Sequence, residues 1–287
     1  MNRKKTGIVA ECVCDLPKNT LKNYEIDILY FLIETESGIF TDTDEITAEN
    51  IISYMETGGG KSKSSPPPVE QYVQKFEKNL EQYDEVVMVT ISSKISQSFA
   101  TANHAVQLLG EKGKRVRVFD SGHLSSGLGF MVMKAAETAN IGFSADEIVT
   151  ELELYKERVC TSFITRNADY LYRNDLVPKA MKIICSKFNI HPVLTMKNGN
   201  MVLKTVLFGN YETACKYYVR TLLKNVHDID KRCAFITHVG CGVKLQRLIQ
   251  SEVEKYYNFN KINLQTASAT ISGNCGPGTF GVLFVRN

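Results

Sequence analysis

The amino-acid sequence predicts an α/β protein, because short apolar segments of strand length alternate with helical patterns along the first half of the chain. The central segment, 86–91, is an unbroken run of β-branched and apolar residues, which is typical of a parallel strand buried on both faces. The second half is less regular, and its Asn198-Gly199 pair is a strong β-hairpin signal. We expect a parallel sheet with helices on both faces over residues 1–155, and a mixed α/β domain over residues 156–287.

The first domain is expected to begin with a strand over residues 7–10 and a helix near Pro17, with Asp15 as its N-cap. A second strand is expected over residues 26–33, followed by a turn or short edge ribbon over 38–43. The other expected elements of this domain are strands at 86–91 and 115–119 and helices at 47–55, 69–83, 99–109 and 125–139.

The second domain is expected to mix strands and helices without a regular alternation. Its predicted strands lie at 160–165, 190–196, 201–206, 232–238 and 280–285, and its predicted helices at 177–187, 211–223 and 243–256.

Composition excludes several classes of function. The net charge of +3 is too small to indicate nucleic-acid binding, and the basic residues are spread along the chain. No stretch reaches the apolar length that spans a bilayer. The basic N-terminus is a poor signal peptide, because the apolar run after it breaks at Glu11. We therefore expect a cytoplasmic protein.

The cysteines and histidines indicate neither a metal site nor a catalytic centre. The eight cysteines are scattered, and none forms a C-x-x-C pair. His238 and Cys241 are the only close pair of the two types, and two ligands do not make a zinc site. The five histidines show no triad spacing, so the residues favour a binding protein over an enzyme.

The clearest loop of the chain covers residues 57–68 and contains Ser64 and Ser65 before three prolines. Its composition is also that of a flexible linker or a proline-rich segment for a partner. However, an amphipathic helix is predicted at once, over 69–83, so we expect the two serines near a helix N-terminus.

The segment after the central strand is a second candidate site. Four serines fall within seven residues at 92–98, directly before the helix predicted from Phe99. A strand-to-helix turn in a parallel sheet is where ligands usually bind, and its backbone N–H groups favour an anion. The alternative is that Ser96 or Ser98 only caps the helix.

A glycine-rich turn at residues 273–278 is the third candidate. No Lys-Ser or Lys-Thr follows it, so it is not a Walker loop, and it does not have the strand-helix context of a dinucleotide fingerprint. Two interpretations stay open at this point: a backbone nest for an anion, and a tight turn between two strands.

The order of these motifs resembles the DegV family of bacterial fatty-acid-binding proteins over essentially the whole chain. In that family an early strand ends in Asp-Ser-Thr-x-Asp-Leu-Pro, a Thr-Ser-Gln-Pro-Ser loop precedes a helix, and an Ile-Ser-Ser-x-Leu-Ser-Gly-Thr elbow follows. An Asp-Ser turn, an Ile-Lys-Pro-Ile-Leu strand and a Gly-x-His-x-Gly-Pro-Gly motif complete the pattern. The matching segments here are 11–17, 64–68, 91–98, 120–121, 190–194 and 273–278.

The resemblance implies a two-domain DegV-like fold, with a Rossmann-like N-terminal sheet and a long-chain fatty acid held between the domains. It implies that the carboxylate is bound by Ser64, Ser65, Ser96, Gln97, Asn274, Gly276 and Gly278. Some members present the acyl group to a separate ATP-binding subunit of a fatty acid kinase, so that subunit is a candidate partner. No cofactor other than the bound fatty acid, no metal and no catalytic residue is implied.

The alternative is an enzyme subunit for small-molecule phosphotransfer, because dihydroxyacetone kinases share the fold type. Those kinases hold substrate through a histidine, and no histidine here lies in a matching motif.

The chain departs from the family pattern at several positions. Glu11-Cys12 replaces Asp-Ser, Gln97 replaces a glycine, and Asn274 replaces the C-terminal histidine. Arginines of the family are also missing at 174–176 and before the helix at Tyr211. Since arginine is the natural residue for holding phosphate, the resemblance supports lipid binding more strongly than acyl phosphate formation.

Overall fold

The structure is a computed structural model that describes residues 4–58, 62–166, 168–173 and 189–287. The helix predicted over 177–187 and the departure at 174–176 lie outside the described residues. The chain forms two compact units, which we describe separately. Unit 1 comprises Met1–Leu32, Ser64–Val159 and Asn198–Asn200, and unit 2 comprises Ile33–Lys63, Cys160–Lys197 and Met201–Asn287.

Unit 1 is built on a parallel four-stranded sheet with the order β2-β1-β6-β7. Its strands are β1 (Lys4–Glu11), β2 (Asp27–Leu29), β6 (Tyr83–Thr90) and β7 (Val116–Asp120). The centre strands β1 and β6 pair from Lys4↔Tyr83 to Ala10↔Val89. Every side chain of β6 from Val86 onward is fully buried, which confirms the predicted central parallel strand.

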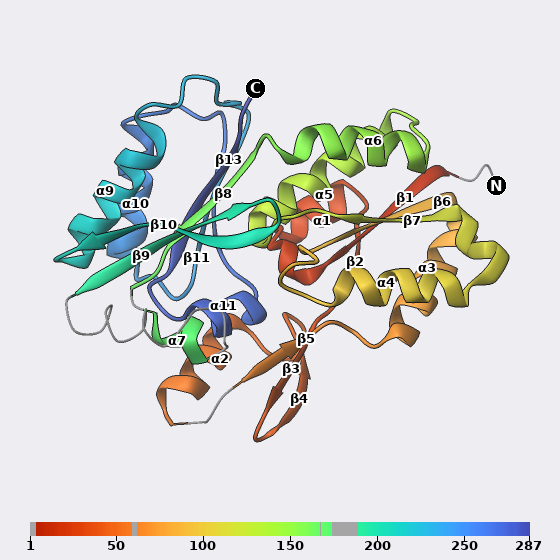
Figure 1. The fold of residues 1–287 in the computed structure, drawn as a ribbon, viewed down its shortest axis with the longest axis horizontal. Helices are drawn as coiled ribbons and strands as arrows, with labels where there is room; N and C mark the ends of the chain where they lie inside the picture. The colour runs from red at the N-terminus through yellow and green to blue at the C-terminus, as the bar shows by residue number, and fades with distance from the viewer. Residues whose placement is uncertain (1–3, 59–61, 167, 174–188) are drawn as a thin grey trace. The chain divides into compact units, whose positions relative to one another are not determined.

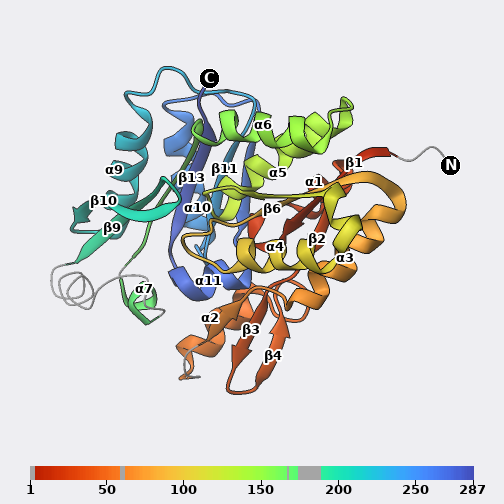
Figure 2. The ribbon, with the colours of Figure 1, turned by 45° about the vertical axis from the view of Figure 1, so that its right-hand side comes forward.

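Helices cover both faces of this sheet, as predicted. On one face α3 (Val69–Gln82) and α4 (Ser98–Leu108) lie side by side and enclose a core that includes Tyr72, Phe76 and Met88 (Figure 2). On the other face lie α5 (Ser125–Asn140) and α6 (Ala145–Lys156) (Figure 1). The remaining elements of the unit are α1 (Lys18–Asn23) and the 3-10 helices η1 (Cys12–Cys14) and η2 (Gly110–Arg115).

Unit 2 is built on a mixed six-stranded sheet with the order β10-β9-β8-β13-β11-β12. Strand β11 pairs in parallel with β12 and antiparallel with β13, and β8 pairs antiparallel with β9, which confirms the predicted mixed domain. The strands are β8 (Val159–Ile164), β9 (Ile190–Lys197), β10 (Asn200–Phe208), β11 (Ala234–His238), β12 (Ile262–Thr266) and β13 (Phe280–Val285).

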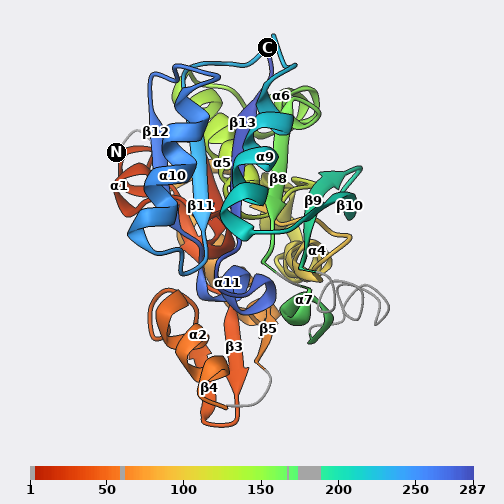
Figure 3. The ribbon, with the colours of Figure 1, turned by 90° about the vertical axis from the view of Figure 1, so that its left-hand side faces the viewer.

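The helices of unit 2 form two groups (Figure 3). Helices α9 (Tyr211–Leu223) and α10 (Val243–Glu254) pack on each other and share a core with the sheet around Tyr218, Ile249 and Phe280. The short helix α11 (Ala269–Cys275) instead contacts α7 (Asp169–Arg173) and α2 (Ala48–Glu56).

The segment around α2 forms a small three-stranded sheet of order β4-β3-β5, made of β3 (Leu32–Thr35), β4 (Gly38–Thr41) and β5 (Lys63–Ser65). The single strand predicted over 26–33 is therefore wrong, because β2 and β3 belong to different sheets. The pairing of β2 with β1 ends at Glu11↔Leu29, where β1 turns into η1 and offers no further partner. The turn or edge ribbon predicted over 38–43 is confirmed as strand β4.

Asp42 explains why this segment groups with unit 2. Its side chain is fully buried, and its two oxygens accept hydrogen bonds from the N–H groups of Ala269 (2.8 Å) and Thr270 (2.9 Å) at the start of α11. Two such bonds to a charged group hold the small sheet onto α11. The predicted domains, 1–155 and 156–287, differ from the two units at this point, since residues 33–63 lie in unit 2.

Two predicted helix caps are corrected by the structure. Asp15 does not cap α1, whose N-cap is Pro17; instead Asp15 has a left-handed backbone (φ 50°) and accepts a 2.5 Å hydrogen bond from Ser125 Oγ. Neither Ser96 nor Ser98 is the N-cap of α4, because Gln97 occupies that position. Within the described residues, none of the helices combines the length and hydropathy that a membrane span requires.

Candidate functional site

The carboxyl end of β6 leads through a tight turn into α4, and this turn, residues 91–97, is called the elbow below. Its first half is fixed from within unit 1: Ser92 N–H donates to His123 O (2.9 Å), and both Ser93 N–H (3.1 Å) and the Ser93 hydroxyl donate to Asp120. Asp120, at the end of the neighbouring strand β7, thus fixes the conformation of the first half of the elbow. The Ser93 hydroxyl therefore already donates its proton within unit 1 and has none left to donate to a ligand.

The second half of the elbow presents a pair of hydroxyls. Ser96 Oγ lies 2.8 Å from Ser98 Oγ, and it also accepts a hydrogen bond from Ser98 N–H (3.2 Å). Ser98 is fully buried, whereas Ser96 is half-buried and so reaches the surface of the unit. Ser96 is therefore the hydroxyl of this pair that a ligand can reach.

Beneath these serines lies Glu11, the last residue of β1, with no exposed surface. Its Oε1 accepts a hydrogen bond from the Tyr72 hydroxyl (2.9 Å), and its Oε2 accepts one from Ile91 N–H (2.8 Å). The Ser98 hydroxyl lies near this carboxyl group and lowers its pKa. Glu11, Tyr72 and Ile91 thus form a buried hydrogen-bond network at the base of the elbow, next to the hydroxyl pair of Ser96 and Ser98.

Burial dominates the electrostatics of this network. Loss of water around Glu11 raises its pKa from 4.5 to about 7, although the Ile91, Tyr72 and Ser98 donors partly oppose the rise. Burial and the neighbouring Glu11 also raise the pKa of Tyr72. Near neutral pH, Glu11 is therefore close to half protonated, while Tyr72 keeps its proton and donates it.

The other predicted residues of unit 1 lie on the segments that lead to this network. Ser64 and Ser65 are half-buried in β5, a few residues before α3, the helix that carries Tyr72. Gln97 is exposed at the N-cap of α4, and its side chain makes no capping hydrogen bond. Its backbone angles (φ −81°, ψ −2°) are ordinary for a side-chain-bearing residue, so the absence of the family glycine causes no backbone strain.

The glycine-rich turn of unit 2 has a different construction. It does not join two strands, as one interpretation held, because residues up to Cys275 form α11 and Gly276 is the C-cap of that helix. The N–H of Gly276 donates to Ser272 O (2.9 Å), and that of Gly278 donates to Val239 O (2.7 Å). The Asn274 amide donates to Thr270 O (2.9 Å). Gly276, Gly278 and Asn274 were predicted to contact the carboxylate, but each of them donates a hydrogen bond to an acceptor within unit 2.

Steric constraints explain two of the glycines in this turn. Gly276 has φ 80° and ψ 163°, a conformation that is essentially restricted to glycine, and a Cβ there would lie 2.2 Å from the Tyr170 ring. Gly278 has φ 85°, and its carbonyl accepts a 2.6 Å hydrogen bond from the Tyr211 hydroxyl. The turn is thus a packing feature of unit 2, and the carboxylate contacts assigned to it stay predictions.

Unit 2 also contains buried polar atoms that the sequence did not indicate. Among the described residues, Thr165 Oγ1, His238 Nδ1 and Thr270 Oγ1 are buried with no hydrogen-bond partner in the structure. Such groups are normally satisfied by water or a ligand. Thr270 is the most relevant, because it lies in α11, one turn before Asn274.

The sequence did not predict Glu11 and Tyr72 as parts of the elbow network. Glu11 was singled out only as a departure from a motif, and Tyr72 only as a residue on the apolar face of a helix. A sequence signal did exist for Glu11: an acidic residue directly follows a fully apolar strand, where a charge must be paired or neutral. Nothing in the sequence pairs it with Tyr72, because 61 residues separate them.

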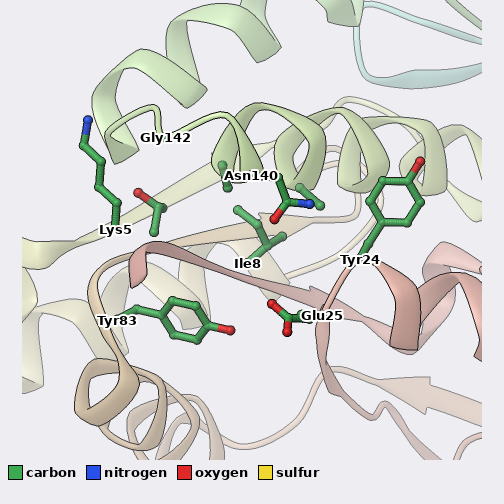
Figure 4. A pocket seen from close by; sticks show the side chains of 10 residues that line it. Lys5, Ile8, Tyr24, Glu25, Tyr83, Asn140 and Gly142 are labelled. Atoms are coloured by element: carbon green, nitrogen blue, oxygen red, sulfur yellow. The ribbon is translucent and has the colours of Figure 1, made fainter. Parts of the chain in front are cut away.

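A separate hollow of about 310 Å³ lies at the opposite edge of the unit 1 sheet (Figure 4). It is lined by residues at the start of β1 and β6 and at the end of α5, among them Lys5, Ile8, Tyr83 and Asn140. The elbow lies at the carboxyl ends of the same parallel strands. The hollow lies toward the other end of these strands, and Ile8, three residues before Glu11, is the last β1 residue that lines it.

Comparison with known proteins assigns the chain to a family. The model of the family described as "Uncharacterised protein, DegV family COG1307" matches residues 5–287. This chain belongs to the DegV family. A DegV domain-containing protein of Caldanaerobacter subterraneus subsp. tengcongensis is 25% identical over 281 residues, which cover 98% of this chain and 99% of that protein.

Solved structures of the DegV family have the same fold. A DegV family protein from Thermus thermophilus, described as fatty acid binding, is similar with a TM-score of 0.86 at 24% identity, over 99% of this chain and 100% of that one. A fatty acid kinase B3 protein of Streptococcus pneumoniae, loaded with linoleic acid, is similar with a TM-score of 0.83 at 18% identity, over the same shares of the two chains. At these identities the likeness shows the fold alone.

Proposed function

We propose that this DegV family member binds one long-chain fatty acid and that the elbow of unit 1 binds its carboxylate. The single observation that carries the proposal is the half-buried Ser96 hydroxyl at the carboxyl edge of a parallel sheet, above a buried network. Relatives of the same fold from Thermus thermophilus and Bacillus subtilis are described as fatty acid binding proteins. The family assignment and the site geometry therefore support the same ligand class.

The acyl tail and the head group of the ligand are proposed to contribute unequally to the free energy of binding. Burying the acyl tail contributes roughly 0.8 kcal/mol per methylene, so a long chain supplies most of the affinity. A hydrogen bond to a charged head group adds about 1.5–3 kcal/mol and fixes its orientation. Of the predicted residues Ser64, Ser65, Ser96, Gln97, Asn274, Gly276 and Gly278, we propose that the three residues of the turn, whose donors are bonded within unit 2, contribute little and that the first four contact the head group. Of these, the elbow hydroxyl of Ser96 is proposed as the main donor.

We further propose that the protein acts without catalysing a reaction itself, as a cytoplasmic carrier that hands the acyl group to a fatty acid kinase subunit. The likeness to the Streptococcus pneumoniae kinase B3 protein supports that partner class. The missing histidine at Asn274 and the missing arginine before Tyr211 predict weaker acyl phosphate formation than in members that have them.

Extraction of lipid from the purified protein tests the proposed function. Native mass spectrometry of protein made in bacteria should show one added fatty acid per chain, and solvent extraction should release it. A protein that carries no acyl chain, and that takes up none when oleate is added, would contradict the proposal.

A further inference from the structure

Ser92, the second residue of the elbow, has no exposed surface and uses all of its polar groups inside unit 1. Its N–H donates to His123 O (2.9 Å), and its carbonyl accepts from Ile95 N–H and Ser96 N–H (both 3.1 Å). Its hydroxyl accepts from Lys94 N–H (3.2 Å) and donates its own proton to a carbonyl. The turn that carries Ser96 is therefore bonded directly to Ser92.

The hydroxyl of Ser92 is held by a segment that is distant in the sequence. It donates a 2.6 Å hydrogen bond to the carbonyl of Gly199, 107 residues further along the chain. Gly199 lies at the tip of the hairpin formed by β9 and β10, and this hairpin tip, residues 198–200, belongs to unit 1, although the two strands are in the sheet of unit 2. The elbow thus has a support that comes neither from the sheet of unit 1 nor from its helices.

The hairpin tip approaches the elbow closely because position 199 is a glycine. Asn198 and Gly199 both have positive φ (49° and 76°), as a two-residue hairpin turn requires. A Cβ at Gly199 would lie 3.1 Å from Ser92 Oγ and 3.2 Å from Lys94 Cγ. Any side chain at this position would press the tip away from the elbow, so the contact depends on the glycine as well as on the serine.

This contact bears on the position of Ser96. Without the Ser92 hydroxyl, the N–H of Lys94 and the carbonyl of Gly199 would each lose the hydrogen-bond partner that they have in the structure. Lys94 lies between Ser92 and Ser96 in the turn, so new partners for its N–H require the turn to move. Donors of a binding site must be held within about 0.5 Å of their productive position by the groups behind them. A shift of the turn therefore weakens a hydrogen bond from Ser96 to an anionic head group.

We propose that Ser92 is a positioning residue for the head-group site and that the hairpin tip supports it: their contact holds the turn so that the Ser96 hydroxyl reaches the carboxylate. The proposal rests on the proposed function and deepens it, because it names the residues that set the preference for a carboxylate over an uncharged head group. Ser92 acts through Ser96 and does not touch the ligand, since it is fully buried and its only hydroxyl proton is donated to Gly199.

Binding of dodecanoate and dodecanol to the full-length protein at neutral pH tests the proposal. The two ligands have tails of equal length, so the ratio of their dissociation constants measures the head-group preference alone. Ser92→Ala should reduce the preference for dodecanoate by about fivefold or more and change dodecanol affinity by less than about twofold, because only a hydrogen bond to the charged group is weakened. Ser162→Ala is the matched control and should keep the wild-type preference, because its buried hydroxyl also donates to a carbonyl, that of Leu194 in unit 2 (3.0 Å).

Gly199→Ala tests the same contact from the hairpin side, and it decides the question where Ser92→Ala does not fold. The added Cβ should reduce the preference for dodecanoate as Ser92→Ala does. The double variant should lose little more than either single variant, because both substitutions act through one contact. Gly209→Ala, directly after β10, is the control for backbone strain and should keep the wild-type preference, since its φ is 91° and no atom lies within 4 Å of the added Cβ.

A carbon-13 label on the carboxylate of dodecanoate gives a readout that a loss of stability alone does not move. The NMR chemical shift of the bound carboxylate should change in Ser92→Ala and Gly199→Ala in the same direction as in Ser96→Ala. The wild-type preference and chemical shift in folded Ser92→Ala or Gly199→Ala, or an equal loss of preference in the matching control, would overturn the proposal while leaving fatty acid binding intact. A wild-type protein that binds neither dodecanoate nor dodecanol would instead overturn the proposed function.

Discussion

The elbow of unit 1 and the glycine-rich turn of unit 2 look alike as sequence but are built from different donors. Both are short, polar or glycine-rich turns next to a strand or helix, and both were predicted to contact an anion. In the elbow, the donors are the side-chain hydroxyls of Ser96 and Ser98, which lie 2.8 Å apart. In the turn, the N–H groups of Gly276 and Gly278 donate to carbonyls of their own unit.

The difference shows that an anion site needs donors that the fold has not already used. The end of α11 presents carbonyl groups and the negative end of the helix dipole, which are unfavourable for a carboxylate. The elbow opens the N-terminal end of α4, where the dipole has the favourable sign. We therefore expect substitutions in the turn to affect mainly stability, and substitutions in the elbow to affect mainly binding.

The largest effect is expected for Gly276→Ala. The added Cβ would overlap the Tyr170 ring at 2.2 Å in a backbone conformation restricted to glycine, so unit 2 should lose about 3 kcal/mol or more of stability. Gly209→Ala is the control for backbone strain alone, because its φ is 91° and no atom lies within 4 Å of the added Cβ. Urea unfolding should show the greater loss for Gly276→Ala, and equal losses would contradict the packing role.

Glu11→Gln should remove a pH dependence of stability. The pKa of Glu11 is raised from 4.5 in the unfolded chain to about 7 in the fold, so the folded state holds the extra proton between these values. The stability that Glu11 contributes is therefore highest below pH 4.5 and falls as pH rises toward 7. Between about pH 5 and pH 8 the variant should gain on the order of 2–3 kcal/mol relative to wild type. Urea unfolding of both proteins at the two pH values measures this gain. If the free energies of unfolding of wild type and variant change equally between the two pH values, Glu11 does not titrate in this window.

Part of the fold and of the candidate site could be predicted from the sequence. The parallel sheet, its central strand and the strand-to-helix elbow could be predicted, because they depend on local patterns of apolar and capping residues. The placement of residues 33–63 could not, because it depends on Asp42 meeting Ala269 and Thr270, more than 220 residues away. The same holds for Glu11 and Tyr72, whose contact exists only after the sheet and α3 have formed.

Tyr72→Phe is expected to have a moderate effect on the elbow network. It removes the hydroxyl that donates to Glu11 Oε1 at 2.9 Å and leaves a buried acceptor with one bond fewer, which costs about 1–2 kcal/mol of stability. It should also raise the pKa of Glu11, because this donor favours the ionised form. Infrared difference spectra of the buried carboxyl band, with Glu11→Gln as the reference, measure that pKa. An unchanged or lowered value would contradict the network as described.

The smallest effect is expected for Asn274→Ala. Its amide donates to Thr270 O within α11, so its loss should change fatty acid affinity by less than about threefold, or roughly 0.6 kcal/mol. Fluorescence titration with a labelled fatty acid measures this change. A loss of tenfold or more would show that Asn274 binds the head group directly and that the turn contributes to head-group binding as much as the elbow does.

The central claim, that the elbow hydroxyl binds the carboxylate, is tested most directly by comparing two ligands on two proteins at about pH 6. Hexadecanoate and hexadecanol have tails of equal length, and only the former has a carboxylate. Ser96→Ala should weaken hexadecanoate binding by about 1–3 kcal/mol, roughly 5- to 150-fold, because it removes a hydrogen bond to a charged group. Hexadecanol binding should change far less. Equal losses for both ligands, or no loss for hexadecanoate, would contradict the claim.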